Sequence, residues 1–79
     1  MSPTVLRIKN YRFYFFSREE RRKHIHVYCT KGEAKIWLEP EIAVAQYYKL
    51  SEKEINDILE IVKEHKDEFI ESWKEHFTG

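Results

Sequence analysis

The stretch KHIHVYC, Lys23–Cys29, decides the fold because polar and apolar side chains alternate along it. Successive side chains of a β-strand point to opposite faces of a sheet, so this alternation predicts a half-buried strand. The face toward the core then carries Ile25, Val27 and Cys29. The opposite face carries His24, His26 and Tyr28. Histidines that face away from the core are candidates for chemistry rather than packing.

The segments around this strand repeat the alternation. Three further strands are predicted, at TVLRIK (4–9), YRFYFFS (11–17) and EAKIWLE (33–39). Lys9-Asn10 forms a tight turn between the first two, and residues 30–32 turn the chain before the last. Pro40 ends that strand, because proline has no N–H to donate to a sheet ladder.

Two segments have a different character. REERRK, residues 18–23, is charged throughout and predicts a loop. IAVAQYY, residues 42–48, fits either a short fifth strand or a crossing segment, and its pattern does not separate the two.

The last third of the chain predicts a helix. Ser51 followed three residues later by Glu54 is a capping box, which marks a helix N-terminus. Apolar residues then recur at helical spacing, at Ile55, Ile58, Leu59, Val62, Phe69, Ile70, Trp73 and Phe77. The stripe thins only at His65 and Lys66, and no glycine or proline interrupts it. We therefore expect one continuous helix.

These patterns predict an α+β protein with a single domain over residues 1–79. An antiparallel sheet of four or five strands covers about residues 3–48, and one long C-terminal helix, about residues 51–77, packs on one face. Cys29 is the only cysteine, which fits a reducing cytoplasm, and it belongs to the core face. The sequence shows neither a signal peptide nor the roughly 20 apolar residues of a membrane helix.

Charge is distributed unevenly although the formal total is zero. Residues 1–37 hold nine Lys/Arg against three Asp/Glu, a balance of +6, whereas residues 38–79 hold five against eleven, a balance of −6. This asymmetry predicts an anion-binding surface in the first half and an acidic surface in the second.

The sheet face opposite the core interleaves cations with aromatic rings. Cations bind phosphates and rings stack on bases, so this composition is typical of single-stranded RNA binding. The expected binding residues are Arg7, Arg12, Tyr14, Arg22, Lys23, Tyr28, Lys35 and Trp37. The same surface also fits a protein-interaction module, because exposed aromatic and arginine residues are typical of interfaces. Its partner would be a small cognate protein or a second copy of this chain.

His24 and His26 are the candidate catalytic residues. One would take the proton of a ribose hydroxyl and the other would protonate the leaving oxygen, which cleaves RNA without a metal. Whether the chain is an enzyme stays open at this point. Two histidines at this spacing can also share a zinc ion if Glu33 or Glu39 supplies a third ligand. The pattern H-x-H is weak, and we expect neither a metal nor another cofactor.

Four stretches, taken together, point to a known family. They are PTVLRI…YRFYFFS, HIHV, EAKIWLEPEI and the helical ending ESWKEHF. From Pro3 to Phe77 the chain resembles the bacterial family called domain of unknown function 4160. That family usually has a glycine before the tyrosine at Tyr11, where this chain has Asn10. It usually has EPP before HIHV, where this chain has Arg21-Arg22-Lys23.

The resemblance carries its own implications about function. Members are found beside small proteins of domain of unknown function 2442, so it implies a cognate partner and a toxin–antitoxin-type role. The sequence therefore predicts a small bacterial protein of this type that binds RNA through its open sheet face. If His24 and His26 are catalytic, it also cleaves the bound RNA. The alternative is a non-catalytic interaction module that uses the same face.

Overall fold

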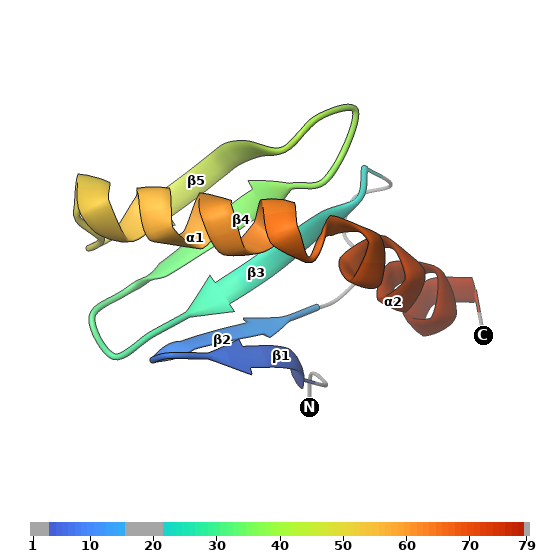
Figure 1. The fold of residues 1–79 in the computed structure, drawn as a ribbon, viewed down its shortest axis with the longest axis horizontal. Coiled ribbons are helices and arrows are strands. Elements are labelled where there is room, and N and C mark those ends of the chain that lie inside the picture. Colours follow the sequence, from blue (N-terminus) through green and yellow to red (C-terminus); the bar gives the residue numbers. More distant parts are fainter. Residues whose placement is uncertain (1–3, 16–21, 79) are drawn as a thin grey trace.

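The computed structural model describes residues 4–15 and 22–78, which form a sheet covered on one face by helices (Figure 1). The strands are β1 (Thr4–Ile8), β2 (Tyr11–Tyr14), β3 (His24–Tyr28), β4 (Glu33–Trp37) and β5 (Ala43–Tyr48). Two helices follow, α1 (Glu52–Glu64) and α2 (Lys66–Thr78). The five strands run antiparallel in the order β1-β2-β3-β4-β5. The α+β class is confirmed, and segment 42–48 supplies the fifth strand.

The core lies between the sheet and the helices, where the sequence alternation placed it. The strands contribute the fully buried residues Phe13, Phe15, Ile25, Val27, Ile36 and Leu38. The helices contribute Ile58, Val62 and Phe69, all fully buried. Cys29 is a buried core residue, as predicted. The tight turn at residues 9–10 is also present, and Lys9 has the left-handed conformation there, at φ 56°.

The prediction of one long helix is wrong, because α1 ends at Glu64 and α2 begins at Lys66. His65 lies between them with φ −110° and ψ 20°, outside helical geometry. A straight helix of 26 residues would be about 39 Å long, whereas the longest dimension of the molecule is 35 Å. The break lets α2 change direction, so that Phe69 stacks on Phe13 at 5.4 Å between ring centroids. The thinning of the apolar stripe at this point is the sequence signal for the break.

The predicted capping box at the start of α1 is confirmed. The Ser51 hydroxyl accepts a hydrogen bond from the Glu54 N–H at 3.1 Å, and the Glu54 carboxylate accepts one from the Ser51 N–H at 2.8 Å. The bond from the Ser51 backbone is the main reason why the pKa of Glu54 is lowered. Within the described ranges, no helix combines the length and apolar character needed to cross a membrane.

Candidate functional site on the open sheet face

The sheet face opposite the helices, here called the open face, is organised in cross-strand rows. Tyr14 lies opposite His26, His26 opposite Lys35, and Lys35 opposite Gln46. These four residues form a central row that crosses β2 to β5. Directly paired residues of an antiparallel sheet have Cβ atoms about 4.5–5.5 Å apart, so neighbours in the row are within contact range.

An outer row runs parallel to the central row, two residues away along each strand. It pairs Arg12 with Tyr28, Tyr28 with Glu33, and Glu33 with Tyr48. Arg7 on β1 lies opposite Arg12 and extends the row by a second cation. The outer row therefore has two cations at one end and, further along, one carboxylate between two tyrosines.

An open groove of about 800 Å³ lies on the open face, over strands β2 to β5. Its lining is Tyr14, His26, Glu33, Ala34, Lys35, Gln46, Tyr47 and Tyr48. Tyr47 and Tyr48 are 59% and 61% exposed, and both come from the edge strand β5. The groove thus offers aromatic rings, an amide, a cation and a carboxylate to a ligand. Its volume lies within the range of ordinary ligand sites.

Ring and cation contacts hold the central row in place. The Arg12 guanidinium carbon lies 5.0 Å from the centroid of the Tyr14 ring, a cation–π distance. The Tyr14 and His26 rings stack with centroids 5.5 Å apart and planes inclined by 24°. Arg12 Nε also donates a hydrogen bond of 2.6 Å to the Thr4 hydroxyl. These contacts fix the orientation of Tyr14 and His26 before any ligand binds, which lowers the entropy cost of binding.

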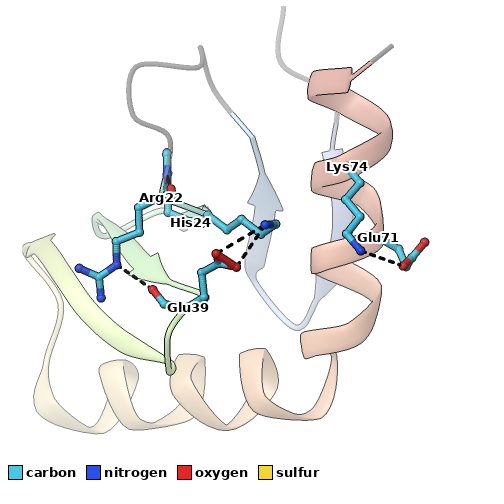
Figure 2. A network of polar contacts seen from close by, with 6 residues as sticks. Arg22, His24, Glu39, Glu71 and Lys74 are labelled. Carbon is cyan, nitrogen blue, oxygen red and sulfur yellow. Dashed lines mark hydrogen bonds and ion pairs between the residues drawn. The ribbon is translucent and has the colours of Figure 1, made fainter.

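A second cluster forms at the end of β4, around Trp37. The Arg22 guanidinium carbon lies 4.2 Å and Lys35 Nζ lies 4.8 Å from centroids of the Trp37 rings. Arg22 Nε donates a 2.7 Å hydrogen bond to the backbone carbonyl of Glu39, as Figure 2 shows. Lys23 Nζ lies 3.1 Å from Glu39 Oε1, so much of its charge is neutralised. Trp37 and Arg22 thus belong to a packed cluster beside the groove, and they do not line it.

The expectation that both histidines are exposed on the open face is wrong for His24, which is only 2% exposed. Its ring makes edge contacts with Trp73 of α2 at 5.1 Å and with Trp37 at 5.8 Å. His24 Nδ1 lies 2.8 Å from the Arg22 carbonyl oxygen, and because that oxygen only accepts, Nδ1 carries the hydrogen. His24 is the first residue of β3, and the Trp73 ring of α2 packs against it. His26 is half-buried and lines the groove.

The pKa of Tyr14, one of the residues that line the groove, is raised above its ordinary value. Burial raises the pKa of its hydroxyl, the nearby Glu33 carboxylate raises it further, and Arg12 opposes both. The hydroxyl therefore stays protonated at neutral pH and can donate a hydrogen bond to a ligand.

The described residues do not form the zinc site that was considered as an alternative. In the described part of the chain, no group of three or more His, Cys, Asp or Glu side chains could hold one metal ion. The third ligand that the histidine pair would need is therefore not in place within these residues.

Only some of the binding residues predicted from the sequence lie in the groove or next to it. Tyr14, His26 and Lys35 line the groove, while Arg7, Arg12 and Tyr28 adjoin it in the outer row. Phe16 and residues 18–21 of the charged segment lie outside the described residues. Gln46, Tyr47 and Tyr48 could not be predicted as groove residues, because the pattern of residues 42–48 does not separate a strand from a crossing segment. Had this segment been assigned as a strand, alternation would have placed Gln46 and Tyr48 on the open face.

The fold and this face define a class: a small two-layer α+β domain whose meandering sheet is covered on one side and carries an aromatic, basic groove on the other. A family model described as Domain of unknown function (DUF4160) matches residues 10–74. The chain therefore belongs to this family, and the resemblance noted from sequence is confirmed. Comparison with curated proteins and with solved structures found no match.

Proposed function

We propose that this protein binds single-stranded RNA in the groove of the open face. The observation that carries the proposal is the central row, in which Tyr14, His26, Lys35 and Gln46 stand side by side on four neighbouring strands. Flat rings stack on bases of any sequence, and the cation attracts the phosphates between them. A row across four strands, each about 4.8 Å from the next, spans about 14 Å. RNA-binding sheets of this width stack two or three bases.

The charge pattern supports the proposal. The two rows of the open face contain three cations and one carboxylate. The cations are Arg7, Arg12 and Lys35, and the carboxylate is Glu33. Nucleic-acid affinity depends mainly on such cations, because each one that contacts a phosphate releases counterions from the RNA.

The geometry favours binding over cleavage by the histidine pair. A metal-free cleavage needs two groups that both reach the ribose and phosphate. His26 lines the groove, whereas His24 is buried between the rings of Trp37 and Trp73. We therefore propose that His24 is structural and that His26 contacts the RNA.

The exposed tyrosines favour a second candidate function, the docking of a small cognate protein. Tyr28 and Tyr48 in the outer row are 49% and 61% exposed, and exposed tyrosines on one surface are typical of interface hot spots. Such docking fits the toxin–antitoxin-type role that the family resemblance implies. Homodimerisation through the same face is the third arrangement to test.

Fluorescence polarisation with a labelled single-stranded RNA of mixed sequence tests the lead proposal. We expect binding at about 50 mM salt that weakens at least tenfold at about 200 mM salt. Lys35→Ala should weaken binding several-fold, while Lys63→Ala, an exposed lysine on α1, should leave it unchanged. The bound RNA should remain intact on a gel.

Three outcomes would change the proposal. Absence of binding at low salt would favour a protein partner as the ligand of the groove, which co-purification with candidate small proteins would then test. RNA products that disappear in His26→Ala would show cleavage. Equal effects of the two lysine substitutions would place the RNA outside the open face.

A further inference from the structure

Glu33 is an unusual residue for a phosphate-binding surface. It is exposed, it lines the groove, and it is the only acid among the described residues that do so. No ion pair or hydrogen bond joins its side chain to the described part of the chain. A carboxylate in this position repels phosphates, and a surface that only attracted the RNA backbone would be better without it.

The neighbours of Glu33 indicate what it could contact. In the outer row it stands between Tyr28 on β3 and Tyr48 on β5. Tyr28 is 49% exposed and Tyr48 is 61% exposed, so both rings are accessible for stacking. A base that stacks on either ring would place its edge beside the carboxylate. Lys35, two residues further along β4 on the same face, would meet the adjoining phosphate.

We propose that Glu33 makes the groove selective for guanine in the bound RNA. This inference rests on the proposed RNA binding and names the base that the site prefers. The two Glu33 oxygens would accept hydrogen bonds from the N1–H and the N2 amino group of one guanine.

The donor pattern of the four bases gives this preference. An ionised carboxylate only accepts hydrogen bonds, and it can accept two parallel ones. Guanine is the base whose Watson–Crick edge presents two adjacent donors. Adenine and cytosine present one amino group beside a ring-nitrogen acceptor, which the carboxylate repels. Uracil presents one N–H between two carbonyl oxygens. The expected order is therefore guanine first, adenine and cytosine next, and uracil last.

Polarisation binding of labelled hexamers tests the inference. The probes are UUUUUU, UUUGUU, UUUAUU, and UUUIUU, in which inosine replaces guanosine and lacks the N2 amino group. Because a bidentate contact to a base contributes about 1–3 kcal/mol, the wild-type protein should bind the guanine hexamer about tenfold more tightly than the uridine hexamer. Inosine should lose a large part of that gain.

The matched variants are Glu33→Gln and Glu52→Gln, both at exposed positions. Glu33→Gln should bind the uridine hexamer as well as or better than wild type and should no longer separate guanine from inosine. Glu52→Gln, on the helix side, should keep the wild-type preference.

The outcomes separate this inference from the proposed function. If no hexamer binds wild type at low salt, the RNA proposal fails and this inference fails with it. If all hexamers bind equally, RNA binding stands and the guanine preference is wrong. If Glu33→Gln keeps the preference, another residue reads the base and Glu33 is not the selective group.

Discussion

At the scale of single residues, His24 and His26 show how two identical side chains on one strand acquire different roles. Both point away from the main core, as the alternation of β3 requires. His26 stands in the middle of the strand, stacks on Tyr14 and faces the groove. His24 stands at the beginning of the strand, where Trp73 of α2 closes over it. The position along the strand therefore separates a buried histidine from one that faces the groove.

The first prediction follows from that difference. His24→Ala should lower the free energy of unfolding by about 2–4 kcal/mol, because it removes a buried ring and the hydrogen bond to the Arg22 carbonyl. His26→Ala should cost under about 1 kcal/mol, because its half-buried ring lines the groove and water can take the place of the removed atoms. Urea unfolding monitored by tryptophan fluorescence measures both. Equal losses would contradict the assignment of His24 as the structural member.

At the scale of secondary-structure elements, β5 forms one side of the groove, and the turn before β4 fixes the position of β5. The backbone of Gly32 packs against β5 so closely that an added Cβ would lie 1.9 Å from the Tyr48 carbonyl oxygen. Only glycine fits at this position, because the obstacle is backbone and cannot rotate away. Gly32 thereby sets the position of Tyr48 and of the neighbouring groove residues.

The second prediction tests that contact. Gly32→Ala should destabilise the protein by about 1–3 kcal/mol, because β5 must move to make room for the methyl group. It should also weaken RNA binding, because Gln46 and Tyr48 would leave their rows. Thr30→Ala, an exposed position in the same turn, is the control and should change neither property. Chemical unfolding and polarisation binding give the two readouts, and an unchanged affinity would show that β5 does not contribute to the site.

At the scale of the whole molecule, the zero net charge hides a separation of charge between two faces. The open face carries Arg7, Arg12 and Lys35, and the helices cover the other side of the sheet. The exposed surface of those helices carries the acids Glu52, Glu60, Glu64, Asp67, Glu68, Glu71 and Glu75. Some of these are paired locally, as Glu71 is with Lys74 on α2 (Figure 2). An approaching polyanion is therefore attracted to one face and repelled by the other.

The third prediction concerns the salt dependence of binding. For single-stranded RNA, the slope of log K against log salt is about −0.7 per phosphate neutralised. Arg7→Gln should reduce the magnitude of that slope by about 0.7, because one phosphate contact of the open face is lost. Lys63→Gln on α1 has the same charge change and should leave the slope unaltered. Binding measured over a series of salt concentrations gives the slopes. A reduction by both variants would mean that the RNA also contacts the helices.

The sequence by itself determined which residues face the core, because side-chain alternation in strands and 3.6-residue spacing in helices are local properties of the chain. Ile25, Ile36 and Ile58 could be assigned to the core without a structure, and Ser51 to the start of the helix. Tyr14, His26 and Lys35 could be assigned to the open face for the same reason.

Tertiary structure decided that the helix breaks in two and what the second helix covers. The break at His65 and the burial of His24 under Trp73 depend on contacts between segments that are far apart in the chain. The groove likewise forms only when β5 pairs with β4 and brings Gln46 opposite Lys35. Such contacts are set by the packing of the whole core, whose shape no local pattern specifies.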